Sequence, residues 1–355
     1  MYRERIEKVS QKMQQNGIDY LLINAPDSVL YLTGQLIAPG ERMMVALIDK
    51  RAELKLFVHD MFKVDLPIGE VTYFGDSDNP VQILSEQLKN DVRIGIDKEW
   101  QARFLMPLME THSAEYVLGS ACVDDVRLIK SAAEIALMEE ASNINDRAMS
   151  MVYQWLCEND ESELEMQGNI KSFFSELGAE GISFTPIVCY GANGAEPHHE
   201  PDETMPSEGA VLVDMGCVYK SYCSDMTRSF YRGKPTEKYL KAYQAVLSAN
   251  LKAIAAVKPG VKMSEIDAVA RGEIESAGLG EYFIHRTGHG IGIVVHEFPD
   301  VSASSDAVCQ PGMFFSIEPG VYLPGEFGIR IEDLVMVTED GCKVINNYPK
   351  ELQLI

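Results

Sequence analysis

The sequence has no long hydrophobic run and no closely spaced cysteines. No apolar segment approaches the roughly 18 residues of a transmembrane helix, so we expect no membrane partner. The seven cysteines include no Cys-x-x-Cys pair, which argues against a zinc knuckle and a disulfide framework. We expect reduced thiols and, because residues 1–10 are typical of an amphipathic helix and not of a signal peptide, a cytoplasmic location.

Positive charge is also scarce. Lysine and arginine total 31 against 54 aspartates and glutamates, which gives a net charge of −23. Such a surface repels phosphate groups, and this argues against a nucleic-acid partner. The same excess of acids is compatible with cation binding, although most of the acids are spread along the chain and are expected to favour solubility.

The chain is long enough for two domains, because 355 residues exceed the usual size of one hydrophobic core. Residues 1–125 alternate strand and helix patterns, which indicates an α/β domain on a mixed sheet. We expect strands there at 18–23, 43–48, 54–58, 71–74 and 93–96, and helices at 2–16, 80–89 and 101–110. No cluster of potential ligands and no phosphate loop stands out, so this domain is expected to contribute shape and assembly.

The second expected domain, residues 126–355, repeats one order of elements. Ser131 and Glu134 form a capping-box pattern ahead of its first helix. Its expected elements are helices at 131–157 and 162–177 with a hairpin of 210–216 and 222–231, then helices at 236–257 and 264–277 with a hairpin of 313–322 and 328–337. Two helices followed by a hairpin, repeated once, predict an internal pseudo-duplication in an α+β domain.

Histidines gather in the second domain. His289 stands between glycines in the stretch HRTGHGIG at 285–292, and His296 follows seven residues later in VHEFP at 295–299. Glycines let the backbone turn tightly or pack closely, so one interpretation is a ligand displayed from a turn. The alternative is a glycine-rich loop whose histidine is satisfied by the protein itself.

Four acids lie in or beside apolar strand patterns: Asp214, Asp225, Glu318 and Glu332. A buried carboxylate needs a partner, because desolvation without one is costly. Buried ion pairs with Arg228, Arg330 and nearby lysines are one solution, but the acids outnumber these bases. Two divalent ions about 3.5–4 Å apart balance the charge better. Oxygen-rich ligands favour manganese, with cobalt, zinc or iron as alternatives.

Residues beside these acids are candidates for holding them. Thr227 lies two residues after Asp225, and Arg330 two before Glu332, so strand alternation places each on the same side as its neighbour. A hydroxyl and a guanidinium there would orient carboxylate ligands, and we expect Arg330 to be engaged with Glu332. The alternative, which the sequence alone favours, is that Thr227 is an ordinary strand residue.

The motifs PHHE at 197–200, SDMTRSF at 224–230, HRTGHGIG, VHEFP, SIEPGVY at 316–322 and GIRIED at 328–333 stand in one order. In this order the chain resembles the "pita-bread" metallopeptidases, above all the proline dipeptidases (prolidases) and Xaa-Pro aminopeptidases. The resemblance covers residues 125–355, and the N-terminal domain is similar to the creatinase/prolidase N-terminal domain.

The resemblance implies a homodimeric exopeptidase that hydrolyses the bond preceding proline in a di- or oligopeptide. It implies two divalent metal ions whose ligands are Asp214, Asp225, His289, Glu318 and Glu332. A hydroxide shared by the metals would attack the scissile carbonyl, with Glu318 carrying the proton. His198 and His296 would stabilise the developing charge, and His285 and Arg330 would line the site.

Two positions depart from the pattern of the resemblance. Val294 stands where many relatives have an acid, and Asp300 stands where some dipeptidases have a base. Asp300 would repel the C-terminal carboxylate of a dipeptide if it faced the site, so dipeptides are expected to be only slightly favoured. Arg42 could supply the missing charge from the partner subunit of a dimer.

Two other functions are compatible with the same fold. One is a creatinase-like amidinohydrolase, which works without the metals, and the other is an inactive pita-bread module that binds peptides. The five intact candidate ligands argue against both, since such relatives lack the complete set.

Overall fold

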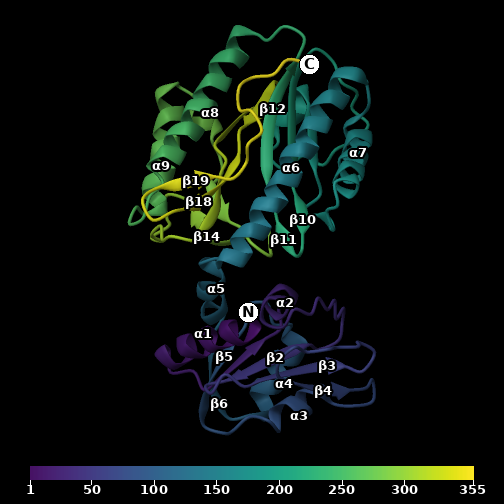
Figure 1. Ribbon diagram of the computed structural model, residues 1–355, viewed down its shortest axis with the longest axis vertical. Helices are drawn as coiled ribbons and strands as arrows, with labels where there is room; N and C mark the ends of the chain where they lie inside the picture. Colours follow the sequence, from purple (N-terminus) through teal and green to yellow (C-terminus); the bar gives the residue numbers. More distant parts are fainter. The chain divides into compact units, whose positions relative to one another are not determined.

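A computed structural model describes residues 1–355, and the chain divides into two compact units, Met1–Arg127 and Leu128–Ile355. The boundary falls near the end of helix α5 (Ala121–Leu128), whereas the sequence analysis placed it between residues 125 and 126. Each unit mixes helices and strands (Figure 1), which confirms the predicted fold class.

The N-terminal unit is built on one six-stranded sheet with the order β4-β3-β2-β1-β5-β6. Its strands are β1 (Tyr20–Ile23), β2 (Val45–Asp49), β3 (Leu54–His59), β4 (Glu70–Phe74), β5 (Val92–Ile96) and β6 (Ala114–Leu118). Its other helices are α1 (Tyr2–Gln15), α2 (Pro26–Thr33), α3 (Pro80–Ser85) and α4 (Ala102–Thr111). The sheet is mixed, because β2 pairs antiparallel with β1 and β3 while the other pairs are parallel. The sequence patterns did not predict β6 or α2.

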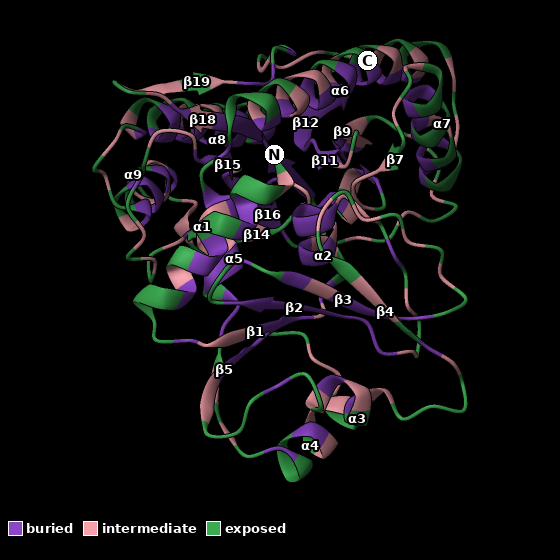
Figure 2. Ribbon diagram, turned by 60° about the horizontal axis from the view of Figure 1, so that its bottom comes forward, coloured by how far each residue is buried: buried purple, intermediate pink, exposed green.

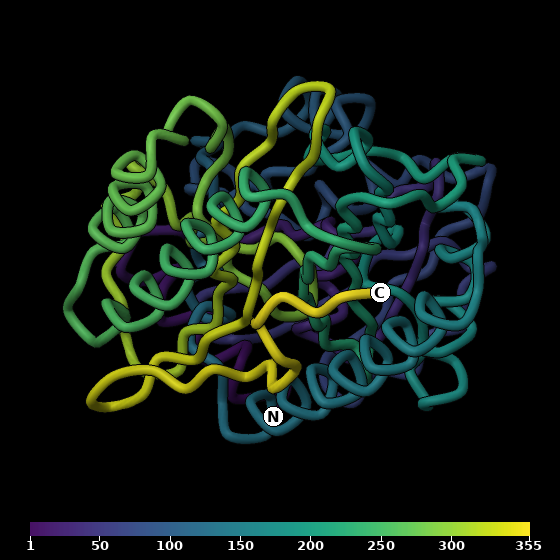
Figure 3. Tube along the Cα trace, turned by 90° about the horizontal axis from the view of Figure 1, so that it is seen from above, coloured from purple at the N-terminus to yellow at the C-terminus, as the bar shows by residue number.

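The second unit contains the repeat that the sequence predicts. Its helices are α6 (Ala132–Glu158), α7 (Glu163–Glu176), α8 (Glu237–Ala256) and α9 (Met263–Ser276), with two short 3-10 turns, η1 (Gly191–Ala195) and η2 (Gly280–Tyr282). Capping boxes begin the first two helices, Ser131 with Glu134 and Ser162 with Glu165. In Figure 3 α6 and α7 lie on one side and α8 and α9 on the other, as in Figure 1.

The strands of the second unit lie between these helix pairs. Those of the first half are β7 (Gly181–Ile182), β8 (Ile187–Tyr190), β9 (Gly209–Met215), β10 (Cys217–Tyr219), β11 (Tyr222–Cys223) and β12 (Met226–Arg232). Those of the second half are β13 (Gly288–Gly290), β14 (Glu297–Val301), β15 (Phe314–Ile317), β16 (Gly320–Leu323), β17 (Phe327–Arg330), β18 (Asp333–Val337) and β19 (Cys342–Val344). Figure 2 shows β9, β12 and β15 as buried, whereas α7 and α9 have one exposed face.

One predicted hairpin is wrong in detail. We expected 313–322 to pair with 328–337 as a single ribbon, but each strand is broken in two. β16 pairs with β17, while β15 pairs with β18 in a different sheet. The break falls at Glu318-Pro319, where proline lacks the N–H that a continuous ladder requires. The interruption frees Glu318 from both ladders and lets its side chain enter the space between the sheets.

Each half of the second unit has its own core. Apolar side chains of α6 and α7 pack against β8, β9 and β12, and those of α8 and α9 pack against β15 to β18. The candidate ligands therefore lie in or directly beside strands that helices cover from outside. None of the helices combines the length with the apolar character that crossing a bilayer requires.

Candidate functional site

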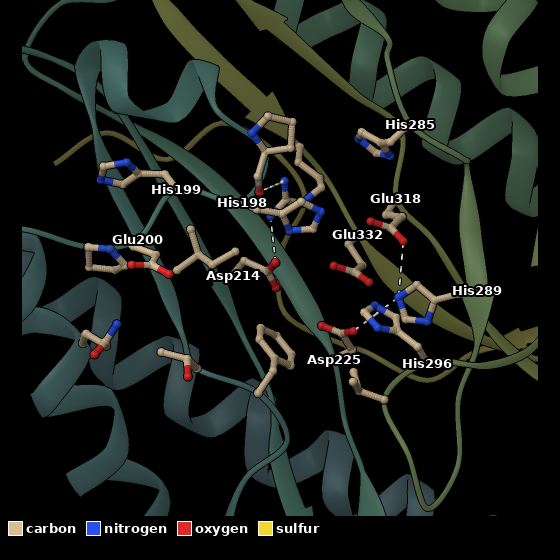
Figure 4. Close-up of a pocket in the computed structure, with 18 of the residues that line it drawn as sticks. His198, His199, Glu200, Asp214, Asp225, His285, His289, His296, Glu318 and Glu332 are labelled. Carbon is tan, nitrogen blue, oxygen red and sulfur yellow. Dashed lines mark hydrogen bonds and ion pairs between the residues drawn. The ribbon is translucent and has the colours of Figure 1, made fainter. Parts of the chain in front are cut away.

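A cavity of about 910 Å³ opens in the second unit. All nine of the site residues that the sequence placed in this unit line it: His198, Asp214, Asp225, His285, His289, His296, Glu318, Arg330 and Glu332. Figure 4 shows the carboxylates of Asp214, Asp225 and Glu332 pointing toward one another, with Glu318 and His289 beside them. The internal repeat explains this convergence, since each half contributes acids from its own strands.

The backbone fixes these acids at the ends of strands. Asp214 lies in β9 opposite Thr227 of β12, and Asp225 immediately precedes β12. Glu332 stands between β17 and β18. Their exposed fractions are only 8% for Asp214, 4% for Asp225 and 2% for Glu332. Water therefore does little to screen the repulsion between them.

Three oxygens of these acids have no hydrogen-bond partner: Asp214 Oδ1, Asp225 Oδ1 and Glu332 Oε1. Burial, and then repulsion by Glu332, Asp214 and Glu318, raises the pKa of Asp225 well above its usual value. Burial and the neighbouring acids raise the pKa of Glu332 in the same way. Buried carboxylates in this condition fit a site for cations, because a cation would supply the missing partner and remove the repulsion.

His289 completes the same arrangement. Its Nδ1 donates to the carbonyl oxygen of Gly290 (3.1 Å), and burial lowers the pKa of the imidazole to about 4. In the neutral ring Nε2 then carries a lone pair, yet it faces Glu318 Oε1 at 3.3 Å and Asp225 Oδ2 at 3.7 Å. Three acceptors facing one another fit a shared cation. Asp225, His289 and Glu332 are close enough for one ion to reach all three.

The bases named as alternative partners do not balance these acids. Arg228 donates to Asp333 Oδ1 (2.8 Å) and to backbone carbonyls, so its charge is used elsewhere. Arg330 and Arg286 are the only arginines that line the cavity, and no lysine does. The buried ion-pair interpretation therefore accounts for one acid only, Asp214, whose Oδ2 accepts from Arg330 at 2.7 Å.

Arg330 and Thr227 hold two of the carboxylates. The Thr227 hydroxyl donates to Glu332 Oε2 (2.7 Å), and Arg330 Nε donates to the Thr227 oxygen (3.0 Å). The expected direct pairing of Arg330 with Glu332 is wrong, since Arg330 reaches Glu332 only through Thr227 and pairs directly with Asp214. Each of the two carboxylates is thereby oriented through one oxygen, and its other oxygen is left without a partner.

Tyr322 is a site residue that the sequence patterns missed. Arg330 Nη1 donates to its hydroxyl oxygen (2.8 Å), and the hydroxyl lies 2.8 Å from His285 Nε2. His285 Nδ1 donates to the carbonyl of Arg286 (2.7 Å), so Nε2 of a neutral ring accepts from the tyrosine. Burial lowers the pKa of His285, which favours that neutral form. The only signal for Tyr322 was its place at the end of SIEPGVY.

His198 and His296 lie on loops and not among the acids. The His296 ring packs edge to face on His289, with 4.3 Å between the ring centroids. Desolvation, and then the neighbouring His289, lowers the pKa of His296 to about 4, so at neutral pH it can donate one N–H and accept at its other nitrogen. His198 contacts the cavity from the loop after η1 (Figure 4).

Two buried polar pairs anchor these loops, and the sequence patterns predicted neither. Glu163 Oε2 lies 2.7 Å from His199 Nε2 and accepts from the Asp202 amide (3.3 Å). Its Oε1 accepts from the Tyr190 amide (2.6 Å) and the Asn193 side chain (3.0 Å). Although Glu163, His199 and Asp202 are close enough to share a metal ion, these hydrogen bonds already occupy both oxygens of Glu163.

The other anchor holds the His296 loop. Lys130 Nζ lies 3.4 Å from Glu297 Oε2, and both side chains are almost fully buried. Glu297 Oε1 also accepts from the amide of Val294 (3.2 Å). Lys130 precedes α6, so the pair ties the residue next to His296 to the start of the long helix. Val294 contributes its backbone N–H to this contact.

The remaining predicted residue, Arg42, belongs to the N-terminal unit. It pairs with Glu41 (2.7 Å) and Asp76 (3.2 Å) and lines a separate cavity with Pro39 and Trp100. The expected role of Arg42 in a dimer stays a prediction.

Comparison with known proteins identifies relatives along the whole chain. Residues 136–339 match the model of metallopeptidase family M24, and residues 5–129 match the creatinase/prolidase N-terminal domain. A putative dipeptidase of Bacillus subtilis, YkvY, is 35% identical over 99% of both chains. Among solved structures, a prolidase from Thermococcus sibiricus superposes with a TM-score of 0.94 at 33% identity over 100% of this chain and 99% of its own. An Xaa-Pro dipeptidase from Bacillus anthracis superposes with a TM-score of 0.90 at 32% identity, with 100% of both chains covered.

Proposed function

Because the chain belongs to metallopeptidase family M24, with a creatinase/prolidase N-terminal domain, we propose that it is an exopeptidase that hydrolyses the peptide bond preceding proline. Its candidate ligands for two divalent ions are Asp214, Asp225, His289, Glu318 and Glu332. The observation that carries this proposal is the set of three buried carboxylate oxygens without a partner. Oxygen-rich ligands support manganese, with cobalt, zinc or iron as alternatives.

When bound, the two ions would lower the pKa of water and polarise the scissile carbonyl. The protein's own residues then have separate tasks. Glu318, the most exposed of the four acids with 15% of its side chain accessible, would carry a proton from water to the leaving nitrogen. Ser316 donates to Glu318 Oε1 (3.1 Å) and holds the carboxylate toward the cavity.

His198 and His296 would donate hydrogen bonds to the charge that develops on the substrate. Both line the cavity, and neither is bonded to the acids. Their loops are fixed by buried pairs, which preorganises the donors before the substrate arrives.

Selection of proline is supported by the shape of the cavity and by the names of the relatives. Phe184, Ile187 and Val295 contribute apolar surface to the cavity, against which a pyrrolidine ring could pack. Proline's tertiary amide has no N–H, so an apolar surface leaves no donor of that residue unsatisfied. The similar proteins from T. sibiricus and B. anthracis are a prolidase and an Xaa-Pro dipeptidase.

We further propose a cytoplasmic homodimer, in keeping with the family resemblance and with seven cysteines that are all free thiols. In this arrangement Arg42 of one subunit would border the site of the other. The chain has 54 acidic and 31 basic residues, and this negative balance argues against a nucleic-acid partner.

The test is a panel of Xaa-Pro dipeptides, Xaa-Pro-Yaa tripeptides and matched Xaa-Ala peptides, assayed after chelation and again after addition of Mn²⁺. We expect cleavage before proline that is lost on chelation and restored by the metal. Creatine hydrolysis by metal-free protein would instead favour an amidinohydrolase. Peptide binding without cleavage by the Mn²⁺-loaded protein would favour the inactive module.

A further inference from the structure

Arg286 is a cation in the cavity with unused hydrogen-bond donors. It lies three residues before His289 and lines the same cavity as the candidate ligands and both loop histidines. Its side chain is 36% exposed, and only Nη1 has a partner, Oδ1 of Asp300. Nε and Nη2 donate to no group of the protein. Part of a fork that matches a carboxylate therefore remains available to a ligand.

Arg330, the other cavity arginine, is not available in this way. It is 4% exposed, and its donors are engaged with Thr227, Tyr322 and Asp214. Binding a substrate carboxylate at Arg330 would weaken the contact that orients Asp214. Since no lysine lines the cavity, Arg286 is the only permanent cation there with donors to spare.

Asp300 has a different role from the one its sequence position suggested. In β14 it lies opposite His289 of β13, and its carboxylate turns to Arg286 instead of lining the cavity. The ion pair neutralises Asp300, so its charge does not act alone on an incoming anion. The pair also limits the directions in which a long side chain can point, which lowers the entropy lost when a ligand binds.

We propose that Arg286, oriented by Asp300, binds the C-terminal carboxylate of a dipeptide substrate and makes free dipeptides the favoured substrates. The inference rests on the proposed function, because it places the scissile bond at the acids and the carboxylate just beyond it. In an Xaa-Pro dipeptide that carboxylate is attached to the α-carbon next to the scissile nitrogen. A receptor for this carboxylate must therefore lie in the same cavity as the acids, as Arg286 does.

The experiment compares Ala-Pro with its amide, Ala-Pro-NH2, which has the same scissile bond but no carboxylate. Mn²⁺-saturated wild-type enzyme, R286A and R286K are assayed, and metal content and melting temperature are measured for each. We expect R286A to lower kcat/KM for Ala-Pro by about 10–100-fold, the scale of a lost charged hydrogen bond. The same variant should change kcat/KM for the amide by less than about 3-fold. R286K, which keeps the charge without the fork, should fall between R286A and wild type.

Asp300 is tested in the same assay. D300N should raise KM for Ala-Pro a few-fold, and this effect should disappear in an R286A background, since Asp300 acts through Arg286. The inference would be overturned if kcat/KM fell equally for Ala-Pro and its amide, or if it fell in neither arginine variant. The peptidase proposal would remain intact in both cases. A wild-type enzyme that cleaves neither substrate would overturn both.

Discussion

The catalytic unit contains two kinds of buried carboxylate that differ in their partners. Asp225 and Glu332, at 4% and 2% exposure, each have one oxygen with no hydrogen bond. Glu163 is fully buried, yet four donors contact its two oxygens. Burial penalises the charged form of a carboxylate in both places. What separates them is whether the protein itself provides the compensation.

This difference divides the acids by task. Both oxygens of Glu163 have hydrogen-bond partners within the protein, so this residue fixes the shape of the loop that carries His198. Asp225 and Glu332 are incomplete without something from outside, which is the condition expected of ligands. Thr227 and Arg330 reinforce the division, because Thr227 holds Glu332 and Arg330 holds Asp214 through one oxygen, and the other oxygen of each has no partner. Substitutions in the two groups should therefore have separable effects on metal content and on rate.

The largest effect is expected at Asp225. D225N should abolish turnover and lower the amount of bound metal, because an amide is a weak ligand that brings no charge. The measurement is metal stoichiometry by elemental analysis alongside the Xaa-Pro assay. E163Q is the matched control, a buried acid from the other group that should retain metal. Full activity in metal-free protein, or equal metal loss in both variants, would contradict the division of the buried acids into metal ligands and structural residues.

Chelation of the wild-type enzyme tests the same point through stability. Ions that bind only the folded state stabilise it, by about 2.7 kcal/mol when the free ion is at 100 times its Kd. We therefore expect a chelator to lower the melting temperature of wild type and to have little effect on D225N. A similar decrease in both proteins would mean that the chelator acts somewhere other than the site.

The next effect is expected at His296. H296A should keep near-normal metal content while kcat falls by about 10²–10³-fold, the usual scale for losing one transition-state donor. H198A should behave in the same way. Steady-state kinetics with Mn²⁺-saturated enzyme and elemental analysis make the distinction. Collapse of metal stoichiometry in H296A would show that the ring contacting His289 is itself a ligand.

A smaller effect is expected at the anchor of the His198 loop. H199A removes the ring 2.7 Å from Glu163 and should lower kcat by roughly 10-fold, because small displacements of a catalytic group are costly. H199Q, which keeps an N–H donor, should recover part of the loss. In an H198A background H199A should have almost no further effect on kcat. An additive loss would mean that His199 supports folding in general and not the position of His198.

The sequence predicted the incomplete acids better than the satisfied ones. An acid in an apolar strand, such as Asp225, conflicts with its surroundings, and that conflict is visible locally. Glu163 gave no such signal, because acids are common in the first turn of a helix and Ser162 already explains the helix start. Its partners lie 27 to 39 residues away, between the end of β8 and the loop that follows η1. The division of the second hairpin at Pro319 is an intermediate case, since proline suggests a break but not the change of partner strand.

The same contrast between satisfied and unsatisfied groups applies to the arginines, and it makes Arg42 the smallest expected effect. Two acids already pair with Arg42, whereas Arg286 retains free donors. A substrate carboxylate reaching Arg42 would have to compete with Glu41 and Asp76. R42A should therefore raise KM for Xaa-Pro dipeptides by only about 2–3-fold, the scale of an exposed ion pair, and should affect Xaa-Pro-Yaa tripeptides less. The measurement is KM for both substrates in R42A and R286A, combined with sedimentation to establish the oligomeric state. R42A could instead raise KM for dipeptides as much as R286A does. That result would mean that an arginine already paired with two acids can still bind a substrate carboxylate. Unpaired donors would then no longer identify the substrate-binding arginine.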